Sequence, residues 1–292
     1  MSALHRFAQL FRTQRGLTLF SRNSLGAFGL LSGVLQIVLA LWVDVAISAP
    51  QRWVLLGALL AVSLLFGAYR AWPQRKVTRE FSNPDIAITV EVGDLFAQGS
   101  HLVIGFTDTF DTDTTNGVVI SSTSVQGQFQ EKVYGGDVGK LDSDLSDALE
   151  RVEYVSTETS EAKPIGKLRR YPISTVATLG SPARHYFCVA YSKMENDLIA
   201  QSSVDALWKS LDAVWDAIHV RGQRKAVSIP IIGSELARVS CLNRESLLKM
   251  ITLSFVARSR QNPVCKELRI VVHPKDFEHI NMLEVDAFLR TL

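Results

Sequence analysis

The sequence predicts an α/β domain in which helices sandwich a mixed sheet, preceded by a two-helix transmembrane hairpin. Two observations predict this class. Near the start of the chain, two long apolar stretches are separated by a short polar connection. Further along, short runs rich in β-branched residues alternate with segments whose apolar residues recur at helical spacing, which is typical of a sheet covered by helices. With 292 residues, 47% of them hydrophobic, the chain is long enough for both parts.

The two apolar stretches cover residues 25–43 and 53–69. An α-helix needs roughly 17 to 25 apolar residues to cross a hydrocarbon core of about 30 Å, and both stretches meet that length. Because the connection between them is short, the two helices must be antiparallel neighbours. We therefore predict a transmembrane hairpin over residues 25–72, with a cleaved signal peptide as the alternative for the first stretch.

Basic residues flank the hairpin on one side of the predicted membrane. Arginines and lysines precede the first stretch and follow the second, whereas the connection has Arg52 beside Asp44. Because cytoplasmic flanks carry an excess of Lys and Arg, both termini are predicted to be cytoplasmic. Residues 1–24 would form a cytoplasmic arm, and the charged, proline-punctuated segment 73–84 would be a linker.

Residues 85–292 are predicted to form the α/β domain. Several of its apolar runs lack polar alternation, which is typical of strands buried on both faces of a sheet. Helices are expected over 202–220, where Ser202 and Asp205 would form a capping box, from residue 243 onward, and from residue 282 to the end. The predicted strands cover 86–92, 101–106, 185–191, 226–232 and 268–273.

Composition argues against several classes of function. The formal net charge is only +2, with basic residues concentrated beside the hairpin, so no nucleic-acid partner is expected. Cys188, Cys241 and Cys265 are isolated and odd in number, which favours free thiols over a disulfide framework or a metal site. We therefore expect no metal and no cofactor.

The loops that follow the predicted strands carry the most specific pattern. They read VGDL at 92–95, GFTD at 105–108, NGVV at 116–119, PIIGSEL at 230–236 and HPKDF at 273–277. In α/β folds, ligands gather at loops beyond the carboxyl ends of strands. In this order and spacing the loops resemble those of a macro domain, the fold that holds ADP-ribose and its derivatives. The resemblance covers residues 85–292 and implies a macro-domain-like mixed sheet.

By this resemblance, the Asp94 carboxylate would accept a hydrogen bond from the adenine amino group, with Gly93 and the Leu95 backbone beside it. Phe277 lies where an aromatic residue of the family packs against adenosine. The residues alone leave alternatives open. Asp94 also suits the cap of a following helix, and an isolated aromatic residue ahead of a helix more often belongs to the core.

The resemblance also implies a diphosphate-binding loop, made of Ile232, Gly233, Ser234, Glu235 and Leu236. Backbone N–H groups that face a negative charge need close approach, which Gly233 permits, and the Ser234 hydroxyl would add a donor. The second glycine usual in the family is replaced near Leu236, and Gly233 could instead simply end a strand.

The loop after the second strand departs furthest from the family. Macro domains that hydrolyse ADP-ribosyl bonds usually carry an asparagine here, followed by several glycines. This chain has Phe106, Thr107 and Asp108, and then a displaced Asn116 with Gly117 alone. The departure implies ligand binding without turnover and without catalytic residues, or a modified ligand whose extra group contacts Thr107 or Asp108.

Two features of the domain stay open. Asp108, Asp111 and Asp113 would suit a hard cation through oxygen ligands, although their alternation with threonine suits a solvated loop equally well. Residues 128–184 exceed a minimal macro domain. They would form either an insertion near the ligand or a surface between subunits.

A macro domain joined to an N-terminal two-helix anchor is similar to the membrane-anchored effector of Thoeris-type antiphage systems. In that family a TIR-domain enzyme makes a signalling nucleotide from NAD. The effector senses it, oligomerises and disrupts the membrane to stop phage spread. The resemblance implies an ADP-ribose derivative such as a histidine conjugate, contact with membrane lipid, and the bacterial inner membrane as location. The alternatives are a membrane-tethered ADP-ribosyl hydrolase and an ADP-ribose-binding scaffold.

The hairpin itself carries a pattern that suits assembly. Small residues let helix backbones approach closely, and a buried amide bonds across helices. The pattern predicts contact between copies of the protein, packing of the hairpin against itself, or both. Small residues at helical spacing and one mid-span glutamine make up the pattern: Gly26, Gly29, Gly33, Gln36, Gly57 and Ala61.

Overall fold

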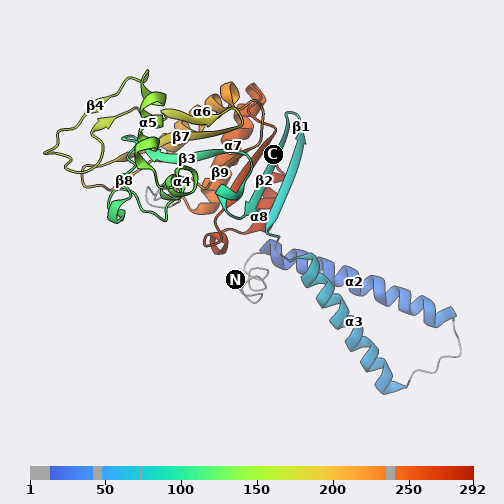
Figure 1. Ribbon diagram of the computed structural model, residues 1–292. Coiled ribbons are helices and arrows are strands. Elements are labelled where there is room, and N and C mark those ends of the chain that lie inside the picture. Colours follow the sequence, from blue (N-terminus) through green and yellow to red (C-terminus); the bar gives the residue numbers. More distant parts are fainter. Residues whose placement is uncertain (1–13, 42–47, 73, 235–240) are drawn as a thin grey trace. The chain divides into compact units, whose positions relative to one another are not determined.

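A computed structural model describes residues 14–41, 48–72, 74–234 and 241–292 (Figure 1). Its contacts divide the chain into two compact units. The first comprises residues 1–75 and 281–287, and the second comprises residues 76–280 and 288–292. Each unit has its own architecture.

The first unit contains the two long helices, α2 (Gln14–Leu41) and α3 (Ala49–Arg70), which pack against each other. By length and composition both qualify as candidate membrane spans. Helix α3 begins after Ser48, whose backbone N–H donates to the Gln51 side chain over 2.9 Å. Because α2 already begins at Gln14, the predicted arm over 1–24 is helical in its second half. A helix is held by backbone hydrogen bonds, so it can begin before the apolar stretch from which it was predicted.

Close packing within the hairpin involves a glycine that the pattern did not include. A Cβ atom on Gly67 would collide with the Ser24 hydroxyl and lie 3.0 Å from the carbonyl oxygen of Phe20. By contrast, a Cβ atom on Gly29 or Gly33 would meet nothing within 4 Å, and the same holds for Gly26 and Gly57. Packing of the hairpin against itself therefore does not explain these four glycines.

The second unit is built on an eight-stranded sheet with the order β1-β2-β10-β9-β3-β7-β6, in which β8 also pairs with β7 (Figure 1). The central strands β2, β10, β9, β3 and β7 are parallel, and β1, β6 and β8 are antiparallel partners. This mixed sheet confirms the predicted class, and the central strands are the ones predicted from apolar runs. The strands are β1 (Lys76–Ser82), β2 (Asp85–Val92), β3 (His101–Thr107), β6 (Val176–Ser181), β7 (Arg184–Met194), β8 (Ala200–Gln201), β9 (Val227–Pro230) and β10 (Glu267–Val272).

Strand β1 corrects the prediction of a linker over 73–84. It pairs antiparallel with β2 along its whole length. Val77 is buried, and the hydroxyls of Thr78 and Thr89 lie 3.0 Å apart across the pair. A strand at the edge of a sheet keeps one face polar, so its charges and flanking prolines gave it the composition of a linker.

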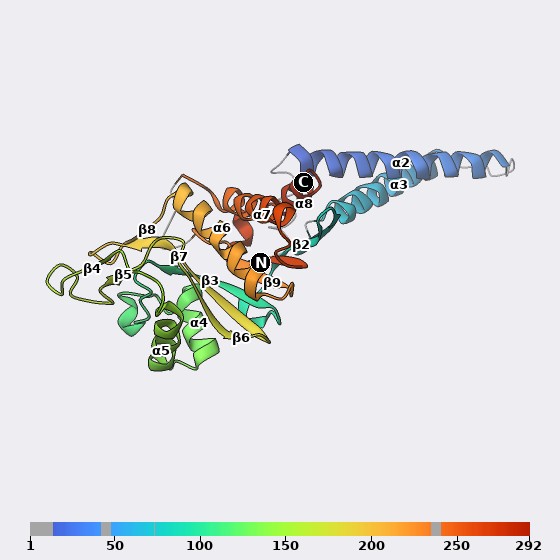
Figure 2. The ribbon, with the colours of Figure 1, turned by 90° about the horizontal axis from the view of Figure 1, so that it is seen from above.

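Helices cover both faces of the sheet, with α4 and α5 on one side and α6 and α7 on the other (Figure 2). The predicted helix over 202–220 is confirmed, but Ser203 caps it by accepting the Ala206 N–H over 3.1 Å. Ser202 instead donates to the Tyr191 carbonyl, which corrects the predicted capping box. These four helices are α4 (Val125–Tyr134), α5 (Val138–Leu149), α6 (Val204–Arg221) and α7 (Arg244–Gln261). A further helix, α8 (Met282–Leu289), contributes residues to both units.

The core on the α4–α5 side is formed by one face of β3. Leu102, Ile104 and Phe106 alternate along this strand and are buried in one cluster with Phe129 of α4. Full burial of such side chains contributes about 1.5 to 3 kcal/mol each. This packing fixes the carboxyl end of β3, from which the next loop departs.

The buried His101 predicts that the domain loses stability in acid. The Nδ1 atom of His101 accepts the backbone N–H of His185 over 2.9 Å, so the ring is neutral and Nε2 donates to the Gly222 carbonyl. Burial lowers the pKa of His101 below its ordinary value. Below about pH 6.5 the unfolded chain therefore binds a proton that the folded chain does not, and stability falls as the pH decreases.

We expect thermal unfolding between pH 7.5 and 5.5 to show this loss, and we expect a shallower pH dependence in His101→Gln. The same change at the exposed His219 is the matched control and should leave the dependence as in the unmodified protein. An identical dependence in His101→Gln would remove His101 as its source.

Candidate functional site

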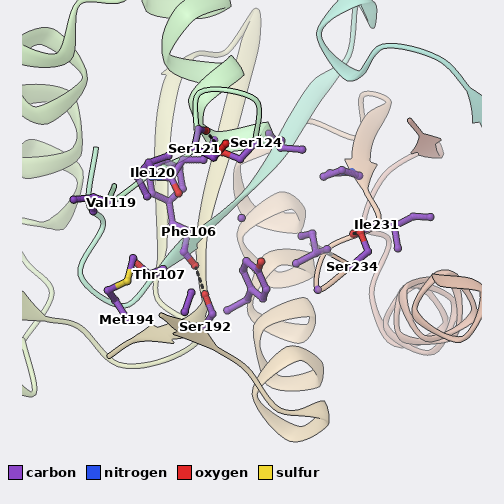
Figure 3. Close-up of a pocket in the computed structure, with 18 of the residues that line it drawn as sticks. Phe106, Thr107, Val119, Ile120, Ser121, Ser124, Ser192, Met194, Ile231 and Ser234 are labelled. Atoms are coloured by element: carbon purple, nitrogen blue, oxygen red, sulfur yellow. Dashed lines mark hydrogen bonds between the residues drawn. The ribbon is translucent and has the colours of Figure 1, made fainter. Parts of the chain in front are cut away.

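A cavity of about 330 Å³ lies at the carboxyl ends of β3, β9 and β10 (Figure 3). Strands β3 and β9 are neighbours in the sheet. From β3 the chain continues to β6 and β7, towards one edge of the sheet, whereas from β9 it continues to β10, towards the other edge. The cavity is therefore at the point where the direction of winding switches. Ligands of open α/β sheets bind at such a point, and the volume lies in the range of small-molecule pockets.

One wall comprises residues 117–121 and the start of α4. Ser124 caps this helix: its hydroxyl accepts the Gly127 N–H over 3.1 Å and donates to the Ser121 carbonyl over 2.7 Å. Val125 and Gln126 belong to the first helical turn and line the cavity. The first N–H groups of a helix lack acceptors within the helix, so this wall offers donors to an anion.

The facing wall is the end of β9 and the residues after it. Ile232, Gly233 and Ser234 line the cavity. Gly233 has a φ of +86°, a conformation that glycine adopts without the strain of a side chain. The Ser234 hydroxyl donates to the Ile231 carbonyl over 2.7 Å, so its proton stabilises this turn. Of the predicted diphosphate loop, Glu235 and Leu236 lie outside the described residues.

A third wall is apolar. Val119, Ile120 and Met194 are buried together, with Leu198 and Ala200 packed against them. All of these residues line the cavity, next to Phe106 and Thr107 of β3 (Figure 3). A ligand would therefore meet the first turn of α4 on one side, the Gly233 turn on the facing side and an apolar surface on the third.

Two ionisable residues that the sequence analysis did not select also reach the cavity. His273 and Asp276 follow β10, and Asp276 lies 2.8 Å from the Nε atom of Arg244. Both belong to the HPKDF segment that follows the last predicted strand. The position after a strand end, from which Phe277 was predicted, therefore indicated these two residues as well. Phe277 itself is buried, as in the core alternative, and it is not among the lining residues.

Six of the predicted binding residues line the cavity, and six other described ones do not. Those that line the cavity are Phe106, Thr107, Gly117, Ile232, Gly233 and Ser234. Those described but absent from the lining are Gly93, Asp94, Leu95, Asp108, Asn116 and Phe277.

Asp94 caps a short helix, which was the alternative to its adenine-binding role. Its carboxylate accepts the Phe96 N–H over 2.9 Å and pairs with Lys132 over 2.7 Å. The hydrogen bond from Lys132 holds the pKa of Asp94 below its ordinary value, so the carboxylate stays ionised. Adenine binding by Asp94 remains a prediction.

The predicted contact between Asp108 and the ligand stays a prediction, and both Asp108 oxygens already accept hydrogen bonds from the protein. One Asp108 oxygen accepts from Arg170 over 2.8 Å, and the other accepts the Met194 N–H over 2.8 Å. Asp108 is 4% exposed, so its oxygens face protein donors. Asp111 is likewise buried, against Lys163. Within the described parts of the chain, no three acidic, histidine or cysteine side chains gather as a metal site.

Comparison with known proteins agrees with this architecture. The family model described as "Thoeris protein ThsA, Macro domain" matches residues 88–273. The Thoeris protein ThsA of Bacillus amyloliquefaciens (strain Y2) is 25% identical over 208 residues, which cover 69% of this chain and 67% of that protein.

Among solved structures, the Oceanobacillus iheyensis macrodomain with ADP aligns with a TM-score of 0.48 and 10% identity, covering 75% of this chain and all of the other. The same macrodomain with MES bound gives a TM-score of 0.47 and 11% identity, with 74% of this chain covered. The family model matches more than half of the chain, and the chain therefore belongs to the Thoeris ThsA macro-domain family.

Proposed function

We propose that this protein is an antiphage effector that binds an ADP-ribose derivative in the cavity of its macro domain and acts on the membrane through its hairpin. The observation that carries the proposal is the cavity at the switch point of a ThsA-type macro domain, between the start of α4 and the Gly233 turn. The first turn of α4 has N–H groups without acceptors in the helix, and Gly233 permits close approach to the turn after β9. Both features support binding of a diphosphate. A TIR-domain enzyme would supply the ligand from NAD.

A histidine–ADP-ribose conjugate is the proposed form of the ligand. Both Asp108 oxygens already accept from protein donors, so we place the extra group beside Thr107 and the apolar wall around Met194. The Thr107 hydroxyl lies 3.2 Å from that of Thr109. Because a hydroxyl both donates and accepts, it can still bond to a ligand.

The proposed output is ligand-dependent oligomerisation. Gly29 and Gly33 leave an open strip on α2, where a second helix can approach closely. A ligand drives such assembly only if it binds the assembled state more tightly than the single copy. Bilayer damage follows if the assembled hairpins disturb lipid packing. Vesicles that hold the full-length protein and a dye should then leak when the conjugate is added.

Gly233→Val should weaken binding of ADP-ribose at least tenfold, because a β-branched residue does not adopt a φ of +86° and the turn must rearrange. Calorimetry with the full-length protein measures this effect. The control is Gly99→Ala, where a Cβ atom meets nothing within 4 Å and the site is outside the cavity lining. Equal affinity in Gly233→Val would contradict the assignment of this wall.

The proposal includes no catalytic role. A membrane-tethered hydrolase would instead convert an ADP-ribosylated substrate, and a scaffold without ligand would give no heat with ADP-ribose or its conjugate. Chromatography of the ADP-ribosylated substrate after incubation distinguishes the hydrolase from the proposed effector, and calorimetry distinguishes the scaffold from it.

A further inference from the structure

An arm of residues 153–171 projects from the macro domain between α5 and β6 (Figure 1). Its two short strands, β4 (Ser156–Thr157) and β5 (Arg169–Arg170), pair antiparallel. The arm lies within the segment 128–184, which the resemblance predicts to exceed a minimal macro domain. It contacts the loop that follows β3, residues 108–112, through both backbone and side chains.

Two buried cations of the arm bind two buried carboxylates of this loop. Lys163 Nζ lies 3.0 Å from Asp111 Oδ2, and the two side chains are 0% and 1% exposed. Arg170 Nη1 lies 2.8 Å from Asp108 Oδ2, and these side chains are likewise buried. Burying charges is costly, and an apolar pair of similar shape is often as stable. These pairs are therefore better explained by the geometry they impose than by stability alone.

The loop between the carboxylates has a strained backbone that the arm holds in place. Phe110 has a φ of +48°, a conformation rare for a bulky residue. Lys167 Nζ donates to the Phe110 carbonyl over 2.8 Å. The Tyr171 and Phe110 rings meet edge-on, with their centroids 5.7 Å apart. Such strain persists only where the surroundings fix the conformation, and it occurs preferentially at functional sites.

Each of the two acidic residues also contacts a residue of the cavity wall. Asp108 Oδ1 accepts the Met194 N–H over 2.8 Å. The backbone carbonyl of Asp111 accepts a hydrogen bond from the Gln126 side chain. Met194 and Gln126 both line the cavity, one on the apolar wall and the other in the first turn of α4. The arm is thus connected to the apolar wall through Asp108 and to the start of α4 through Asp111.

We propose that Lys163 and Arg170 are positioning residues, through which the arm holds the apolar wall and the start of α4 in the geometry that binds the ligand. The proposal rests on the proposed ligand pocket. It assigns the extra segment to the ligand site, and it gives Asp108 and Asp111 a role as attachment points for the arm.

The test is the paired substitution Asp111→Leu with Lys163→Met in the full-length protein, which removes both charges and keeps similar volume. We expect ADP-ribose to bind at least tenfold more weakly. We also expect faster amide hydrogen exchange over residues 113–126, with exchange of the central strands unchanged. The matched control is Asp205→Leu with Lys209→Met, a surface ion pair of the same chemistry, which should change neither.

Unchanged exchange over 113–126 overturns the proposal, as does unchanged affinity where the unmodified protein binds ADP-ribose. If the unmodified protein does not bind, the proposed function fails, and hydrogen exchange alone still decides whether the arm orders the cavity wall. If the paired variant does not fold, Lys167→Met replaces it. This half-buried side chain loses its contact with Phe110 and is judged by the same two measurements.

Discussion

Gly127→Val is expected to lower the free energy of unfolding of the macro domain by about 1 to 3 kcal/mol, the usual cost of overpacking, and to abolish ADP-ribose binding. A Cβ atom on Gly127 would lie 2.7 Å from the Cα atom of Ser122 and collide with the Ser121 carbonyl. These are backbone atoms, so the turn itself must move. That turn carries Ser121 and Ser124 of the cavity wall.

Chemical denaturation followed by the fluorescence of the buried Trp215 measures the stability of the domain, and calorimetry measures binding. Gly139→Ala in α5 is the matched control. A Cβ atom there would lie 3.5 Å from the Asp137 side chain, an ordinary contact, so the change should be neutral or stabilise the helix by up to about 1 kcal/mol. Wild-type affinity in Gly127→Val would show that the turn does not shape the ligand site.

The paired substitution Gly29→Ile with Gly33→Ile is expected to abolish conjugate-triggered leakage from vesicles and to leave ligand affinity unchanged. Both positions face open space on α2, so bulk added there spares the hairpin and blocks close approach of another helix. Dye release measures leakage, chemical cross-linking of the full-length protein measures assembly, and calorimetry measures ligand affinity.

Two controls separate assembly from damage to the hairpin. Leu30→Phe adds bulk at the same depth on an exposed apolar residue and should leave leakage intact. Gly67→Ile, by contrast, should disrupt the hairpin itself, because its side chain would collide with Ser24. Full leakage in the Gly29 and Gly33 variant would mean that this face of α2 does not mediate the membrane damage.

The elements that the sequence predicted well share one property, which is a signal contained in a few consecutive residues. Strand β3 has an apolar run with β-branched residues, and Asn243 precedes a helical pattern that it caps by accepting the Ser246 N–H. Strand β1 was missed because its polar face resembled a linker. The Ser203 cap was missed by one residue because two adjacent serines offer the same local chemistry.

The predicted residues that line the cavity lie in loops or strand ends at one edge of the sheet, a position that the order of strands and loops indicates. Two of them, Gly233 and Gly117, adopt positive φ angles. Asp94 and Asp108 were chosen for their carboxylates, and both carboxylates are engaged by protein donors. The carboxylate chemistry was visible in the sequence, but the donors that occupy it were not.

The sequence by itself determined the apolar helix pair, the buried parallel strands and the resemblance to a macro domain, because each depends on the order of nearby residues. Only the tertiary structure decided which polar side chains face the cavity. Asp108 and Asp111 are held by cations that lie 62 and 52 residues further along the chain. Pairing over such separations depends on how the arm folds back onto the domain, which no local pattern specifies.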